Sequence, residues 1–99
     1  MDIRWEIDND TVTVGVSGKL NTPVAMNIDD RFMEMSGEIR NIYFDFDGLQ
    51  YISSAGLRIL YWALQYTGKK GGRRWVRNVS PEVLEVFNVT GLADSIPME

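Results

Sequence analysis

The chain contains neither cysteine nor histidine among its 99 residues. Without cysteine it can form no disulfide and no thiolate metal site, and thiol catalysis is excluded. Without histidine it lacks the usual imidazole general base and the commonest zinc ligand. These absences leave few routes to catalysis, so we expect no enzymatic activity, no bound metal and no cofactor.

Long apolar stretches are missing as well. None approaches the roughly 20 residues that a helix needs to span a bilayer, and residues 1–6 do not have the pattern of a signal peptide. We therefore expect a cytoplasmic protein without membrane insertion, and the lack of cysteine suits a reducing compartment. With 44% hydrophobic residues, the chain has the size and composition of one compact domain over residues 1–99.

The net charge of −4 is unevenly distributed. Residues 1–50 carry four basic and ten acidic side chains, whereas residues 51–99 carry six basic and four acidic ones. Five of those basic residues surround Gly71-Gly72. A single short basic turn in an acidic protein favours a solvated loop over a nucleic-acid surface. We predict no direct nucleic-acid binding, although the turn could contribute to a surface for an acidic partner. The five residues are Lys69, Lys70, Arg73, Arg74 and Arg77.

The first half of the chain predicts a hairpin, a helix and a strand. Apolar residues alternate over 3–7 and again over 12–16 around an Asx-rich link, which indicates a β-hairpin with one buried face. Thr22-Pro23 predicts a helix start with Thr22 as the N-cap, and Ser36-Gly37 ends that helix. Residues 42–46 predict a third strand, and Tyr43 suggests that this strand is covered on both sides.

The second half predicts a helix from about residue 55 to 67, with Gly68 as its left-handed cap. A strand over 74–79 follows, and Ser80-Pro81-Glu82 starts another helix. Residues 91–96 indicate a short closing turn or helix. The order is thus ββαβαβα, and strand–helix–strand links of this length make right-handed parallel crossovers. We predict an α/β domain with a mixed sheet of about four to five strands and three to four helices.

Two carboxylates, Asp45 and Asp47, lie at the carboxyl end of the third predicted strand, and ligands often gather at the carboxyl ends of such strands. Acid–base chemistry would require one of them to be buried with a raised pKa. Asp29-Asp30 is interpreted as a solvated helix face. Ser53-Ser54 lacks the flanking glycines of a nucleophile elbow, and the chain offers no histidine as its base. Hydrolase chemistry is therefore not expected.

The segment Tyr51-Ile52-Ser53-Ser54-Ala55-Gly56-Leu57-Arg58 is the most informative part of the chain. It places two hydroxyls at the start of an apolar helix, where the first backbone N–H groups lack intrahelical partners. A serine there commonly serves as an N-cap. The other interpretation is a hydroxyl held where the helix dipole favours an added phosphate. The segment by itself leaves both roles open.

This segment and Ser17-Gly18-Lys19-Leu20-Asn21 together resemble the two loops of a STAS domain. That domain is the fold of bacterial anti-sigma factor antagonists, also called anti-anti-sigma factors. The earlier segment resembles the family's Gly-acid/base-Leu-Asp loop, and the later one resembles its Asp-Ser-Ser/Thr-Gly-Leu loop. The resemblance extends to residues 80–92 and covers nearly the whole chain. It implies a single STAS-like domain that regulates transcription through protein–protein interaction.

The resemblance also implies a switch. In this family an anti-sigma factor that is also a serine kinase phosphorylates the hydroxyl two residues before the glycine, which here is Ser54. Phosphorylation abolishes binding and a serine phosphatase restores it. Asn21 and Ser53 stand where the family often has Asp, so two negative charges near the phosphoacceptor are absent. The implied partner-binding residues are Gly18, Leu20, Asn21, Thr22, Ser53, Ala55, Gly56, Arg58 and Trp62.

Two other functions remain open at this point. One is a STAS subunit of a membrane transport or stress-signalling complex that binds its partner without phosphorylation. The other is a nucleotide- or small-ligand-binding module that uses backbone N–H groups near residues 53–56. The chain also ends soon after Ile96-Pro97-Met98, which leaves no clear room for the family's final strand and long terminal helix. A sheet edge freed in this way could support a weak homodimer.

Overall fold

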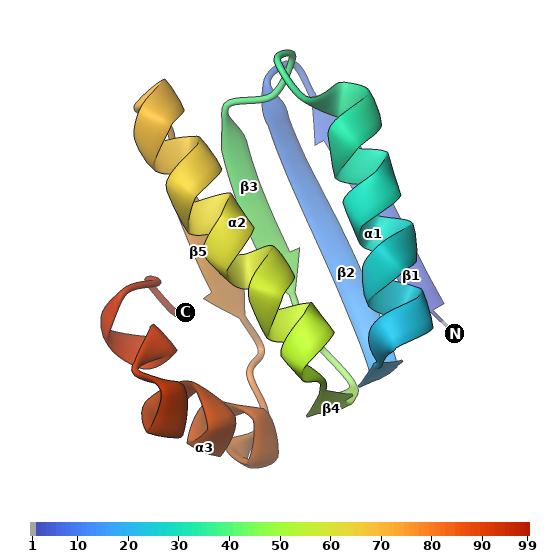
Figure 1. The fold of residues 1–99 in the computed structure, drawn as a ribbon, viewed down its shortest axis with the longest axis vertical. Coiled ribbons are helices and arrows are strands. Elements are labelled where there is room, and N and C mark those ends of the chain that lie inside the picture. The colour runs from blue at the N-terminus through green and yellow to red at the C-terminus, as the bar shows by residue number, and fades with distance from the viewer. Residues whose placement is uncertain (1) are drawn as a thin grey trace.

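Five strands form one mixed sheet in the computed structural model, which describes residues 2–99 (Figure 1). Strands β1 (Asp2–Asp8) and β2 (Thr11–Leu20) make the predicted antiparallel hairpin. The other three strands, β3 (Asn41–Asp45), β4 (Leu49–Ile52) and β5 (Arg74–Arg77), are parallel to their neighbours. The long β2 pairs with β1 on one side and with β3 and then β4 on the other, while β5 lies beyond β3. The predicted α/β class with a mixed sheet is confirmed.

Helices α1 (Thr22–Met35) and α2 (Ser54–Lys70) lie side by side over one face of the sheet, as Figure 1 shows. Helix α3 (Pro81–Thr90) packs near β4 and leads into a short 3-10 helix, η1 (Leu92–Asp94). Within residues 2–99 no helix combines the length and apolar character needed to cross a bilayer. Helices α1 and α2 therefore form a single layer, and both begin at the same end of the molecule.

The core lies between this helical layer and the sheet. Alternating residues of β2 and β3, such as Val14 and Phe44, are buried against the inner face of the helices, where Ile28 and Phe32 are also buried. Alternation with period two sends these side chains to one face of the sheet, and their burial is the main stabilising contribution to the fold. This core fixes the ends of β2 and β4, from which the two helices start.

The prediction that the third strand is covered on both sides is wrong. Both α1 and α2 lie on one face, and Tyr43 on the opposite face of β3 stacks on Trp75 of β5 with 4.3 Å between ring centroids. The guanidinium of Arg77 lies 5.1 Å from the Trp75 ring centroid. The cross-strand stacking of Trp75 on Tyr43 thus shields the apolar part of Tyr43 without a second helical layer, and Arg77 packs on Trp75 within β5.

The sequence did not reveal β4, so the observed element order is ββαββαβα rather than ββαβαβα. The strand has four residues, and its two central side chains, Gln50 and Tyr51, are exposed. It forms because the turn at Gly48, which has a φ of +82°, returns the chain alongside the end of β2. A strand this short is defined by its neighbour rather than by its own pattern.

Two helix boundaries also differ from prediction. Helix α2 continues through Gly68 and ends at Gly71, which adopts the left-handed conformation with a φ of +67°. The basic residues Lys69 and Lys70 occupy its last turn, where they complement the helix dipole. Helix α1 is capped by Asn21 rather than by Thr22, because the Asn21 Oδ1 accepts a hydrogen bond from the Val24 N–H at 3.2 Å.

The sheet edge that the sequence analysis considered free for self-association is partly paired at β5. The N–H of Val76 donates to the Pro97 carbonyl at 3.0 Å, and the N–H of Glu99 donates to the Val76 carbonyl at 2.9 Å. Met98 therefore pairs with Val76 in a parallel bridge beside β5. These bonds satisfy part of the β5 edge, and self-association remains a prediction.

Candidate functional site

Helices α1 and α2 begin side by side because the strands that precede them end together. Leu20 at the end of β2 is in register with Ile52 at the end of β4. The N–H of Ser53 then donates to the Leu20 carbonyl at 2.9 Å, which holds the two chain segments together just before both helices start. The predicted loops at residues 17–21 and 51–58 therefore meet at one end of the molecule (Figure 1).

The two serines before α2 have different roles. Ser53 is extended, and its Oγ accepts a hydrogen bond from the Gly56 N–H at 3.1 Å, so Ser53 is the N-cap. Ser54 is the first residue of the helix and is exposed. Within residues 2–99 no partner forms a hydrogen bond with its hydroxyl. The capping role that the sequence left open thus belongs to Ser53, and the Ser54 hydroxyl is left available.

Neither helix start carries a negative charge of its own. The first turns of α1 and α2 contain no acidic residue, whereas the first turn of α3 contains Glu82. A helix N-terminus has partial positive charge from its unpaired N–H groups. Both helix dipoles therefore remain uncompensated by acidic side chains within their own first turns.

Leu20 and Gly56 support this site from inside rather than forming its surface. Leu20 is 2% exposed and Gly56 is buried. A Cβ at position 56 would lie 2.8 Å from side-chain atoms of both Leu20 and Ile52, so only glycine lets α2 approach the strand ends this closely. Both residues are among the implied partner-binding residues, and their burial indicates support of the site from beneath, so their place in an interface stays a prediction.

Three other predicted residues line a groove of about 210 Å³ between α1 and α2. Ala55, Arg58 and Trp62 come from α2. Trp62 is half-buried and stacks on Phe32, with 5.2 Å between ring centroids, so one wall of the groove is fixed by the core. The groove is lined by Ala25, Met26, Asp29, Ala55, Arg58, Ile59 and Trp62.

Sequence reasoning missed four of the groove residues: Ala25, Met26 and Asp29 on α1, and Ile59 on α2. Met26 is 63% exposed, and Asp29 was interpreted only as part of a solvated face. A methionine one turn after the predicted start of α1 and outside its predicted core face was the available signal, because methionine is common at adaptable binding surfaces. Of the remaining predicted residues, Thr22 is exposed at the first position of α1, while Gly18 and Asn21 are partly buried.

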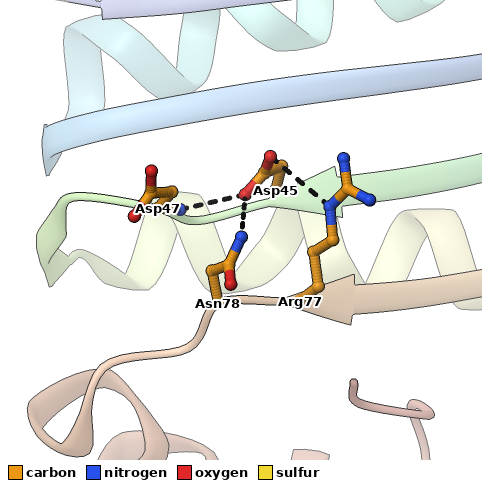
Figure 2. A network of polar contacts seen from close by, with 4 residues as sticks. All are labelled: Asp45, Asp47, Arg77 and Asn78. Atoms are coloured by element: carbon orange, nitrogen blue, oxygen red, sulfur yellow. Dashed lines mark hydrogen bonds and ion pairs between the residues drawn. The ribbon is translucent and has the colours of Figure 1, made fainter.

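Asp45 belongs to a separate polar cluster, drawn in Figure 2. Its Oδ1 accepts hydrogen bonds from the Asp47 N–H at 3.1 Å and from the Asn78 Nδ2 at 2.9 Å. Its Oδ2 lies 3.4 Å from the Arg77 Nε. These contacts tie the turn after β3 to the segment after β5.

The electrostatics of this cluster argue against acid–base chemistry. Partial burial raises the pKa of Asp45, but the hydrogen bonds from Asn78 and Asp47 and the positive charges of Arg77 and Arg4 together outweigh it, so the pKa is lowered. A general acid would need the opposite shift. The carboxylate of Asp45 is ionised at neutral pH and serves as a structural acceptor.

Comparison with known proteins identifies the family of this domain. The family model for the STAS domain matches residues 2–99. The anti-sigma-B factor antagonist of Bacillus subtilis is 22% identical over 89 residues, which cover 90% of this chain and 81% of that protein.

Solved structures show the same fold. SpoIIAA, an anti-sigma factor antagonist, superposes in its unphosphorylated form with a TM-score of 0.82 at 20% identity, covering 99% of this chain and 87% of the other. The phosphorylated form of Bacillus SpoIIAA gives a TM-score of 0.81 at 21% identity, with coverage of 99% and 91%. The chain belongs to the STAS domain family, as residues 17–21 and 51–58 predicted.

Proposed function

We propose that this protein is a cytoplasmic anti-sigma factor antagonist that binds an anti-sigma factor and is switched by phosphorylation of Ser54. The relatives named as antagonists support the first part of this proposal. The proposed phosphorylation of Ser54 depends on one observation, that the two serines have different roles. Because Ser53 caps α2, the exposed Ser54 hydroxyl can accept a phosphate without the loss of the N-cap.

The proposed partner covers the start of α2 and the groove beside it. Met26 and Trp62 supply apolar surface there, and Arg58 and Asp29 supply one charge of each sign. An interface with an apolar centre and a few charges at its rim fits this composition. The partner in this proposal is an anti-sigma factor with serine kinase activity, and a serine phosphatase resets the switch.

Phosphorylation would act on binding through charge. A phosphoserine carries about −1.5 to −2 charges at neutral pH. The N-terminus of α2 tolerates that charge in the free protein, since its first turn holds no acidic residue. A partner packed over Ala55 would have to bury the phosphate, and burying a charge without a matching partner costs several kcal/mol. The modified protein therefore keeps its fold and loses its partner.

The phosphorylation test combines the protein with its proposed partner, a purified anti-sigma factor with serine kinase activity, and with ATP, and reads the product by intact-mass and fragmentation spectrometry. We expect one phosphate, located on Ser54. Ser54→Ala should accept none, while Ser53→Ala is the matched control and should still be modified. A phosphate at another residue, or undiminished labelling of Ser54→Ala, contradicts the assignment.

Calorimetric titration of the same partner separates this function from constitutive binding. The unmodified protein and Ser54→Ala should bind, whereas the phosphorylated protein should lose at least tenfold in affinity. Equal binding of the unmodified protein, Ser54→Ala and the phosphorylated protein would instead indicate a STAS subunit that is not regulated through this serine.

A further inference from the structure

Arg58 lies one helical turn after Ser54, and its guanidinium forms no ion pair or hydrogen bond within residues 2–99. Its side chain is exposed and lines the groove between α1 and α2. Among residues 2–99 it takes part in no ion pair, and Asp29 across the groove is not bonded to it. The guanidinium is therefore free to respond to a new charge nearby.

Helix geometry directs Arg58 towards Ser54. Residues four apart lie on the same helix face, with their Cβ atoms about 5–6 Å apart. Side chains in a helix also lean towards its N-terminus, which inclines Arg58 towards position 54. An acid four residues before a base is the more favourable order of such a pair. Phosphoserine at 54 and arginine at 58 would have this order.

We propose that phosphorylated Ser54 captures Arg58 and withdraws it from the groove. This inference rests on the proposed function for the phosphorylation of Ser54. It adds Arg58 as the residue through which that phosphate changes the charge in the groove. Arginine presents a planar fork that matches phosphate oxygens in a bidentate pair. Arg58 is thus a positioning residue whose location depends on the state of Ser54.

The consequence is a change in the groove rather than only at the helix start. In the unmodified protein the groove offers Arg58 and Asp29, one charge of each sign. Once Arg58 pairs with the phosphate, Asp29 remains as the charge that faces a partner. A partner that uses an acidic group to contact Arg58 loses that contact and also meets the carboxylate of Asp29. Phosphorylation therefore acts at two places separated by one helical turn.

The pairing can be measured in the free protein by installing phosphoserine at position 54 during translation. The second ionisation of a phosphoserine has a pKa of about 6, and 31P NMR follows it as the pH is varied. Pairing with Arg58 favours the dianion, so we expect this pKa to be about 0.2–0.4 of a pH unit lower in the wild-type protein than in Arg58→Gln. Arg58→Lys should keep part of the difference, because lysine keeps the charge but not the fork.

Two matched variants remove one positive charge elsewhere. Lys69→Gln alters the last turn of the same helix, about 22 Å along its axis from Ser54. Lys19→Gln removes the one positive charge on β2 and β4, the two strands that end at this site. Both should leave the phosphate pKa as in the wild-type protein. Circular dichroism of each phosphoprotein establishes that it is folded.

A phosphate pKa in Arg58→Gln equal to that of the wild-type protein overturns the proposal, and so does a shift caused by Lys19→Gln instead. The Arg58 Nε–H resonance gives a second readout, since it should move on phosphorylation of the wild-type protein. Because the phosphoserine is installed without a kinase, this result is independent of the kinase test. Pairing without enzymatic labelling would reject the proposed function alone, whereas labelling without pairing would reject only the role of Arg58.

Discussion

Two polar clusters follow the carboxyl ends of parallel strands in this molecule, and they are built in opposite ways. Around Asp45, after β3, the polar groups are satisfied by one another through hydrogen bonds from Asp47 and Asn78 and an ion pair with Arg77 (Figure 2). Around Ser54, after β4, the backbone is capped by Ser53, yet the Ser54 hydroxyl and the Arg58 guanidinium have no bonded partner within residues 2–99.

This difference in bonding indicates a structural role for the Asp45 cluster and an interaction role for the Ser54 surface. A cluster whose donors and acceptors are matched internally contributes to stability and has little left to offer a ligand. A surface whose backbone is satisfied but whose side chains are not can accept a phosphate or a partner at small cost to the fold. In the sequence both clusters are short polar segments at the ends of apolar strands, so the pattern alone does not show which one is internally satisfied.

The largest expected effect concerns the support beneath the Ser54 surface. Gly56→Ala places a methyl group 2.8 Å from Leu20 and Ile52 side-chain atoms, and we expect a loss of about 2 kcal/mol in unfolding free energy from overpacking. Urea denaturation measures it. Gly68→Ala in the same helix is the control, because a Cβ there meets no other heavy atom within 4 Å. That variant should gain about 0.5–1 kcal/mol.

Equal stability of the two glycine variants would contradict the close approach of α2 to the strand ends. It would also remove the physical reason for glycine at position 56.

The Asp45 cluster should show its structural role in the pH dependence of stability. Asp45→Asn should lower the unfolding free energy at pH 7 by about 1 kcal/mol through loss of charge-assisted hydrogen bonds. Because the pKa of Asp45 is lowered in the folded state, its contribution is complete above the unfolded value of about 3.9 and is lost as the pH falls through the folded pKa. The difference between variant and wild type should therefore shrink at low pH in urea titrations.

Asp47→Asn provides the comparison for that experiment. The Asp47 side chain is exposed, and the cluster uses its backbone N–H rather than its carboxylate. A pH-independent gap between Asp45→Asn and the wild-type protein would count against the ionised acceptor role of Asp45.

The smallest effects distinguish the two serines. Ser53→Ala removes the N-cap and should cost about 1 kcal/mol of unfolding free energy, and Ser80→Ala at the start of α3 should cost a similar amount. Ser54→Ala should change stability by less than about 0.5 kcal/mol, as for an exposed residue without a bonded partner. Thermal unfolding of the three variants is sufficient. A larger loss for Ser54→Ala than for Ser53→Ala would reverse the assignment of the cap.

Local signals predicted much of the fold. The alternation over residues 3–7 and 12–16 gave the hairpin, and Ser80-Pro81 gave the start of α3 with Ser80 as its cap. The errors occurred where two local signals competed. Asn21 and Thr22 are both good caps, and Gly68 and Gly71 can both end a helix. In the structure Asn21 caps α1 and Gly71 is the C-cap of α2.

The sequence predicted where the candidate site lies along the chain, but not which of its residues are buried or which α1 residues complete it. The segment 51–58 identified a helix start with two hydroxyls, and the resemblance selected Ser54. It could not show that Leu20 and Gly56 face inward, nor that Met26 and Asp29 on α1 complete the groove. These facts depend on how α1 and α2 lie beside each other.

The amino-acid sequence by itself determined which segments become strands and helices, since period-two and helical patterns, caps and prolines act within a few residues. Only the tertiary structure decided that β4 exists and that residues 97–99 pair with β5. Those outcomes rest on hydrogen bonds and close packing between segments far apart in the chain. Their free energy is realised only when the whole sheet has formed.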